Sequence, residues 1–241
     1  MRVAVCLSGQ PRQLDKCIDT LLRDVIVPNN ADVFYHTWWD ESLDGTPFDS
    51  AQPHQIGSVG KWDSTNIKIL ETLNAKNSII QKPMNFIVSG LRSSPTANQN
   101  SMCSVFYSQW RSGLLKSKYE NDNNFKYDVV IRARLDIVYN GVIDINNIGI
   151  KSSTLVLANK WQDIRQSLIP GLGDYTMDDN FAIGDSATMD TYLSVYPNMA
   201  NLNAKIHVPF AENYLGWHCK KDNNIQVETH NFLIEISHRI K

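Results

Sequence analysis

The stretch Tyr-Asp-Val-Val-Ile-Arg-Ala-Arg-Leu-Asp, residues 127–136, says most about the fold. Its β-branched, apolar character predicts a buried strand over residues 127–139. Side chains alternate between the two faces of a strand, so Arg132, Arg134 and Asp136 are expected to share one face. The opposite face is apolar throughout and is formed by Val129, Ile131, Ala133, Leu135 and Ile137.

Two arginines and an aspartate inside an apolar strand are costly to bury unless they pair with each other or bind a ligand. One interpretation is a structural Arg–Asp pair. The other is a site for phosphate and a divalent metal, because arginine suits bidentate phosphate contacts and a carboxylate suits Mg²⁺ or Mn²⁺. The residues alone leave both interpretations open.

Around this stretch, strand-like segments alternate with helical patterns. Strands are expected at residues 3–7, 31–36, 78–81, 86–88, 154–158, 181–184, 225–227 and 232–236. Helical spacing appears at residues 14–22, 67–73, 102–114, 189–196 and 211–219, with Asn100 or Ser101 expected as one N-cap and Asp185 or Ser186 as another. This alternation predicts an α/β fold with a mostly parallel central sheet covered on both faces. Ligands bind such sheets beyond the carboxyl ends of the strands.

The loop after the first strand is one such place. Ser8 and Gly9 follow the strand, and Arg12 precedes the next helix. Gly9 would let the backbone approach a ligand closely, and Arg12 would meet an anion. The alternative is an ordinary strand–glycine–helix turn, since neither G-x-G-x-x-G nor G-x-x-x-x-G-K-[ST] is present.

Two further groups are candidates for chemistry. Asp178 and Asp179 precede a short apolar strand. We expect Asp179 to take a proton from an acceptor hydroxyl. The alternative is that the two aspartates form an exposed acidic turn without a chemical role. His218 lies near the end of the last predicted helix. It is either a ligand for a metal or a phosphate, or a structural histidine. Four tryptophans, Trp38, Trp39, Trp62 and Trp161, lie in or beside two long loops and either stack on sugar rings or pack the loops down.

Length, charge and cysteine content narrow the class of protein. The 241 residues suit one globular domain over residues 1–241. A net charge of −2 without a long basic run does not suggest a nucleic-acid partner. The apolar runs are strand-sized, so neither a transmembrane segment nor a signal peptide is expected. The four cysteines form no C-x-x-C pair and are expected to be buried free thiols, which points to the cytoplasm.

Several segments together resemble a known family. They are Arg-Val-Ala-Val-Cys-Leu-Ser-Gly-Gln-Pro-Arg (2–12), Asp-Val-Phe-Tyr-His-Thr-Trp (32–38), the 127–136 stretch, and Asp-Asp-Asn-Phe-Ala-Ile-Gly (178–184). In order and spacing they are similar to glycosyltransferase-like proteins of bacterial surface-polysaccharide clusters and of large viruses and phages. The resemblance implies the GT-A fold, a Rossmann-like α/β/α sandwich, in a protein of the bacterial or the host-cell cytoplasm.

That resemblance also implies an activity and a site. The activity is transfer of a sugar from a nucleotide-sugar donor to a glycan or other hydroxyl acceptor, with Mn²⁺ or Mg²⁺ at the diphosphate. The family's D-x-D motif corresponds here to Arg134-Leu135-Asp136, which keeps only the last carboxylate. The metal would then bind Asp136, and Arg134 would offset part of the diphosphate charge. His218, singled out from the sequence and not by the resemblance, is the other expected metal ligand.

The remaining expected donor-site residues are Ser8, Gly9, Arg12 and Arg132, and Asp136 and Asp179 are the expected catalytic residues. The alternatives are a non-catalytic GT-A-like relative that binds a glycan or a protein, and another nucleotide-using transferase such as a sulfotransferase.

Overall fold

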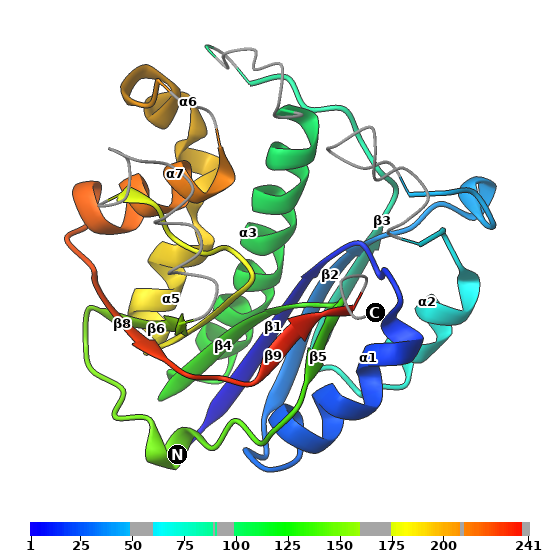
Figure 1. Ribbon diagram of the computed structural model, residues 1–241, viewed down its shortest axis with the longest axis horizontal. Helices are drawn as coiled ribbons and strands as arrows, with labels where there is room; N and C mark the ends of the chain where they lie inside the picture. Colours follow the sequence, from blue (N-terminus) through cyan, green and yellow to red (C-terminus); the bar gives the residue numbers. More distant parts are fainter. Residues whose placement is uncertain (49–59, 89, 91–98, 160–174, 208–209, 238–241) are drawn as a thin grey trace.

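The structure is a computed structural model that describes residues 1–48, 60–88, 90, 99–159, 175–207 and 210–237. A seven-stranded sheet in the order β3-β2-β1-β4-β7-β6-β8 runs through these residues (Figure 1). All its neighbouring strands are parallel except β7, which is antiparallel to both β4 and β6. The strands are β1 Val3–Gly9, β2 Asp32–Trp38, β3 Asn77–Gln81, β4 Val129–Arg134, β6 Thr154–Ala158, β7 Phe181–Gly184 and β8 Gln226–His230.

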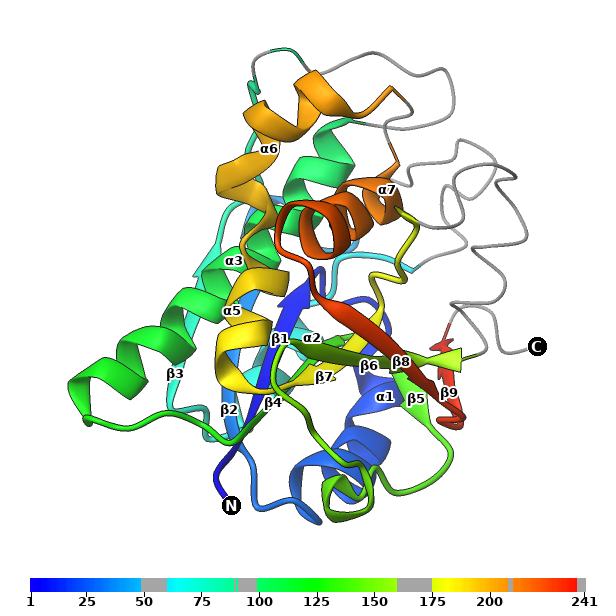
Figure 2. The ribbon, with the colours of Figure 1, turned by 90° about the vertical axis from the view of Figure 1, so that its left-hand side faces the viewer.

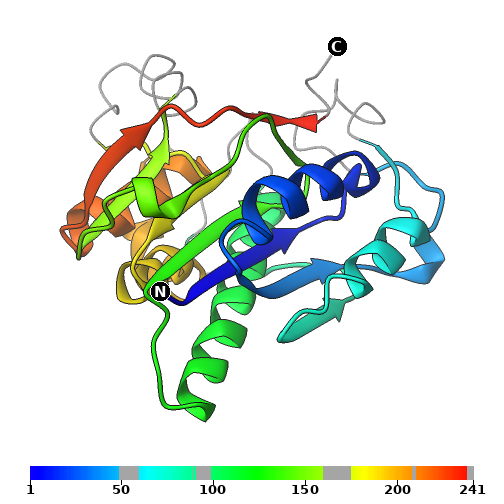
Figure 3. The same cartoon turned by 90° about the horizontal axis from the view of Figure 1, so that it is seen from below.

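Helices cover both faces of this sheet, as Figure 3 shows from below. One face carries α1 (Leu14–Leu21) and α2 (Ser64–Glu71). The other carries α3 (Gln99–Asp122), α5 (Ser186–Leu193), α6 (Val195–Lys205) and α7 (Ala211–Gly216). The mostly parallel, Rossmann-like α/β/α arrangement predicted from the alternation of strands and helices is therefore confirmed.

The inner strand β1 is apolar on both sides because helices cover both faces of the sheet. Val3, Val5 and Leu7 pack in the core beneath α1, while Ala4 and Cys6 pack in the core beneath α3. Such continuous burial is typical of parallel strands in α/β proteins. The predicted cap of α5 is also present, since the Asp185 carboxylate accepts a hydrogen bond from the Thr188 amide.

The strand expected over residues 127–139 is not continuous, which corrects that prediction. β4 ends at Arg134, and after a turn at Leu135 and Asp136 the chain continues as β5 (Ile137–Tyr139). β5 leaves the main sheet and pairs antiparallel with β9 (Ile234–Ile236). In Figure 2 the two strands lie side by side near the C-terminus. The Ser237 amide donates to the Asp136 carbonyl, which ties the turn to the end of β9.

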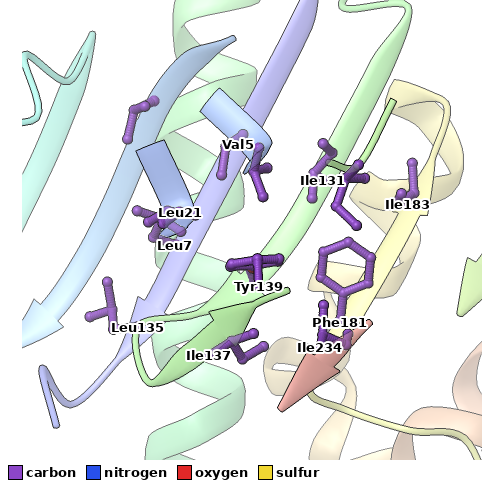
Figure 4. Close-up of a cluster of buried hydrophobic side chains, with 14 of the residues drawn as sticks. Val5, Leu7, Leu21, Ile131, Leu135, Ile137, Tyr139, Phe181, Ile183 and Ile234 are labelled. Atoms are coloured by element: carbon purple, nitrogen blue, oxygen red, sulfur yellow. The ribbon is translucent and has the colours of Figure 1, made fainter. Parts of the chain in front are cut away.

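This small sheet closes the core on the α1 side. Figure 4 shows β1, α1, β4, β5, β7 and β9 all contributing apolar side chains to one cluster. Its labelled members are Val5, Leu7, Leu21, Ile131, Leu135, Ile137, Tyr139, Phe181, Ile183 and Ile234. Burial of this apolar surface explains why β5 folds back over the sheet instead of extending β4.

Three local predictions need correction. Residues 86–88 form no strand; Phe86 and Val88 pack against the core. α3 begins at Gln99, so Asn100 and Ser101 lie inside the helix and do not cap it, and the Asn100 side chain instead accepts from the Phe86 amide. Helix α6 was not predicted. It includes Tyr196, which had been assigned to the preceding helix.

All four cysteines, Cys6, Cys17, Cys103 and Cys219, are buried free thiols, as the absence of paired spacing predicted. Burial raises the pKa of Cys6 to about 12 and the pKa of Cys103 to about 11. Among the described helices, none combines the length and the apolar character needed to cross a membrane.

Candidate functional site

The candidate site lies at the carboxyl ends of β1 and β4. After β1 the chain crosses to β2 and β3 on one side, whereas β4 lies on the other side of β1. The carboxyl ends of β1 and β4 are therefore neighbours at this edge, and open α/β sheets bind ligands beyond the carboxyl ends of their strands. The strand register places Ser8 directly beside Arg134 at this edge. The antiparallel β7 brings the residues before Phe181 to the same edge.

Arg134 and Asp136 form a side-on ion pair at the centre of this edge. Arg134 Nε donates to Asp136 Oδ1 and Nη2 donates to Oδ2, each at 2.7 Å. The Asp136 side chain is 3% exposed and that of Arg134 is 25% exposed. Of the two interpretations left open by the sequence, the Arg–Asp pair is thus present, and the Arg134 side chain stays partly exposed.

A second set of hydrogen bonds holds Arg134 from the β7 side. Arg134 Nη1 donates to Asn180 Oδ1 at 2.9 Å. The Asn180 amide group donates in turn to Asp178 Oδ1 at 2.6 Å, and the Asn180 backbone amide donates to Asp178 Oδ2 at 3.1 Å. Because a carboxylate only accepts, Asp178 fixes the orientation in which Asn180 presents its oxygen to Arg134.

The carboxylates around Arg134 also set its protonation. Burial by itself lowers the pKa of Arg134, but Asp136, Asp179 and Asp178 outweigh it and leave the pKa raised. Arg134 therefore keeps its positive charge throughout the physiological range.

Arg12 approaches the pair from the loop after β1. It is half-buried, its Nε donates to Gln10 Oε1 at 2.8 Å, and its guanidinium lies 5.5 Å from the Phe48 ring centroid. Burial lowers the pKa of Arg12 to about 10, while the charge of Asp136 raises it and that of Arg134 lowers it. Arg12 thus stays protonated at neutral pH and adds a second positive charge to the edge.

Gly9 has a backbone conformation that suits glycine alone. Its φ is +116°, and a Cβ added there would meet no atom within 4 Å. The Gly9 amide donates to Ser108 Oγ at 2.8 Å and its carbonyl accepts from Thr37 Oγ1 at 2.9 Å. Both backbone groups are therefore engaged by the protein, and the open side of the residue is at its Cα. Neighbouring Ser8 is buried, and its hydroxyl has no hydrogen-bond partner among the described residues.

Arg132 and Asp179 are joined by a buried hydrogen bond behind this edge of the sheet. Arg132 is 1% exposed, and its Nη1 donates to the main-chain oxygen of Asp179. Arg132 thus holds the turn before β7 and does not itself reach the surface in this arrangement. Asp179 is 8% exposed. β7 begins at Phe181, so both Asp178 and Asp179 lie in the turn before the strand. The acceptor role of Asp179 stays a prediction.

The structure does not bring His218 into the cluster around Asp136. His218 is buried beside the junction of α5 and α6, with its Nε2 3.1 Å from both Ser194 Oγ and the Thr191 carbonyl. The carbonyl only accepts, so Nε2 carries a proton. Burial lowers the pKa of His218, which favours the neutral ring.

A divalent metal does not fit the donor set around Asp136 in this arrangement. Both of its carboxylate oxygens already accept from a guanidinium, and a bound Mn²⁺ or Mg²⁺ would stand beside that positive charge. In the described part of the chain, no three His, Cys, Asp or Glu side chains converge in a way that could hold a metal ion.

Trp38 and Trp62, two of the four tryptophans near the loops, pack into the protein. Both are buried in an aromatic cluster with Phe48 and Tyr107, and Trp62 lies 4.6 Å from Phe48 between ring centroids. For these two the packing interpretation is correct. Trp39 is half-buried against Trp62, and Trp161 lies outside the described residues.

Asn180 is the site residue that sequence reasoning missed. It had been quoted within the Asp-Asp-Asn segment but given no role. The signal was the Asp-x-Asn spacing ahead of a strand, which is typical of a turn in which the first side chain accepts from the backbone amide two residues later. Here that turn also aims the Asn180 side chain at Arg134.

No protein-family model matches this sequence, and no curated protein matches it significantly. Among solved structures, the chain is similar to the apo form of the glycosyltransferase GlyE of Streptococcus pneumoniae TIGR4, with 13% sequence identity and a TM-score of 0.47. The alignment covers 95% of this chain and 45% of GlyE, so the chain spans less than half the length of that protein.

Proposed function

We propose that this protein is a glycosyltransferase that uses a nucleotide-sugar donor and a glycan or other hydroxyl acceptor. The observation that carries the proposal is the cluster of Arg12, Arg134 and Asp136 at the neighbouring carboxyl ends of β1 and β4. Neither the position nor the arginines depend on the family resemblance, and the motif segments 2–12, 127–136 and 178–184 of that resemblance contribute residues to this edge.

The chemistry of sugar transfer suits these side chains. When a sugar leaves a nucleoside diphosphate, negative charge develops on the leaving phosphate, and positioned positive groups stabilise it. Arg134 and Arg12 would supply that charge. The attacking hydroxyl loses a proton, and Asp179 is the carboxylate proposed to take it in an inverting reaction.

A non-catalytic relative that binds a glycan or a protein partner is the second candidate. One observation favours it. The only carboxylate left from the D-x-D pattern, Asp136, already has both oxygens bound by Arg134.

Slow hydrolysis of the donor separates the two candidates without knowledge of the acceptor. Purified protein is incubated with a panel of UDP-, GDP-, ADP- and CMP-linked sugars, and release of the nucleotide is followed by chromatography. We expect release above the no-protein background with one donor class, and loss of that release in Arg134→Met. Release above background would rule out the non-catalytic relative, and no release with any donor class would support it instead.

A further inference from the structure

We infer that the Arg134 guanidinium, held between Asp136 and Asn180, takes the place of a divalent metal ion and that the site binds the donor diphosphate without one. The inference rests on the proposed function, because it names how that donor is held. The family resemblance predicts the opposite, a metal at Asp136. The geometry of the pair carries the inference.

Both oxygens of the Asp136 carboxylate already accept hydrogen bonds from a cation at the place where a divalent metal ion would have to bind. A divalent ion would require at least one carboxylate oxygen, and both oxygens lie 2.7 Å from nitrogens of Arg134. Each oxygen keeps a second lone pair, but an ion bound there would lie directly beside the guanidinium, at a carboxylate that is nearly fully buried. The ion would be repelled by the charge of Arg134 and by that of Arg12, which also interacts with the Asp136 charge.

Arg134 has the capacity to replace the ion. A guanidinium carries five N–H donors. Asp136 uses one on Nε and one on Nη2, and Asn180 uses one on Nη1. Each terminal nitrogen therefore keeps one N–H for a phosphate oxygen, on a side chain that is partly exposed at the ligand-binding edge of the sheet.

The surrounding hydrogen bonds hold this guanidinium in place before any ligand arrives. Asp136 fixes one edge of the plane, and Asn180, itself oriented by Asp178, fixes Nη1 from the other side. The Asp136 carbonyl is in turn bound by the Ser237 amide at 2.9 Å. A group positioned in advance loses little conformational entropy on binding, so one arginine becomes an effective diphosphate anchor.

The test is a thermal-shift titration of the whole chain with UDP, GDP and ADP, each in excess EDTA and each with Mn²⁺. A ligand that binds only the folded protein raises its melting temperature. We expect at least one nucleotide to give the same rise in EDTA as with Mn²⁺. A rise only with Mn²⁺ would overturn the metal-free site and leave the proposed function standing. No rise with any nucleotide under either condition would overturn the proposed function itself.

Variants identify the anchor. The double substitution Arg134→Met with Asp136→Asn removes both charges together, which avoids a buried unpaired carboxylate, and we expect it to abolish the rise in EDTA. An unchanged rise would overturn the role of Arg134. Should that variant melt too early to assay, Arg134→Lys keeps the charge beside Asp136 but lacks the planar fork, and we expect it to reduce the rise.

A matched control exists on η1 (Leu22–Ile26), the π-helical turn after α1. There Arg23 binds Asp24 through the same two-pronged contact, Nε to Oδ1 at 2.8 Å and Nη2 to Oδ2 at 2.6 Å. This pair lies beyond the C-terminal end of α1, whereas Arg12 lies ahead of its N-terminal end. Arg23→Met with Asp24→Asn should leave the rise intact, and its loss would show that the effect is not specific to the candidate site.

Discussion

The Arg134 guanidinium and the Asp136 carboxylate meet side-on across the turn that ends β4, with two nitrogen–oxygen distances of 2.7 Å. The contact joins residues only two apart in the sequence, yet it forms because the chain turns out of the sheet at Leu135. It is therefore both part of the candidate site and part of the structure of the turn.

This pair should show an asymmetric effect on stability. Arg134→Met leaves the buried Asp136 carboxylate without its main partner, and we expect it to lower the free energy of unfolding by about 2 kcal/mol or more. The double substitution with Asp136→Asn removes both charges, so we expect it to lower the free energy of unfolding by less than Arg134→Met alone. Urea unfolding followed by tryptophan fluorescence measures both. A double variant less stable than Arg134→Met would contradict this account.

The backbone at Gly9 gives a second prediction. A side chain at φ +116° is strained even though the space beside the Cα is open, so Gly9→Ala should destabilise by about 1–3 kcal/mol. Gly149 is the matched control, because an added Cβ there also meets nothing within 4 Å and its φ is not positive. Equal unfolding midpoints in urea for the two alanine variants would refute the strain.

A third prediction concerns a buried lysine between α3 and α5. Lys116 is fully buried, and its Nζ donates to Ser186 Oγ at 2.6 Å, Asp190 Oδ1 at 2.7 Å and Glu120 Oε2 at 3.1 Å. Lys116→Met removes one of the cations that pair with the buried Glu120 carboxylate. We expect it to lower the free energy of unfolding by about 3–5 kcal/mol.

Lys118 on the same helix is the control for Lys116. It pairs with Asp122 at 2.8 Å, but both side chains are more than half exposed, so Lys118→Met should change stability by less than about 1 kcal/mol. Thermal and urea unfolding of both variants compares them directly. A similar loss in the two variants would mean that burial does not govern the effect.

The fourth prediction concerns acid sensitivity. His36 is buried with Nδ1 2.9 Å from Ser108 Oγ, and burial lowers its pKa from 6.5 to about 4. The unfolded chain then binds a proton between these values that the folded chain does not. Stability from this group is complete above pH 6.5 and falls as the pH drops toward 4, by at most about 3 kcal/mol.

His36→Gln tests this by removing the titrating ring while keeping hydrogen-bonding groups. The carboxylates that also lose stability in acid are unchanged, so the difference between the two proteins isolates His36. We expect the variant to lose less unfolding free energy than the natural chain between pH 7 and pH 4.5, measured in urea. Parallel pH profiles would show that His36 does not titrate in this way.

Local patterns predicted most elements well. β6 and β7 have the expected bounds, because short apolar runs flanked by polar turn residues leave few alternatives. The long strand over residues 127–139 was wrong for a physical reason. Its alternation continues through Leu135, but Ile137 and Tyr139 gain burial by pairing with β9, almost a hundred residues later. No local pattern reports such a partner.

The candidate site was likewise predicted in part from the sequence and in part only visible in the structure. The sequence by itself determined the covered, mostly parallel sheet and singled out Arg12, Arg134 and Asp136, because charged residues beside apolar strands are conspicuous. Only the tertiary structure decided that Asp136 faces Arg134 and that Asn180 holds the guanidinium. It also decided that Arg132 binds the turn before β7 and that His218 is buried beside α5 and α6. Those outcomes depend on where β7, α5 and the C-terminal strand pack, and packing between segments distant in sequence leaves no periodic signal in any one of them.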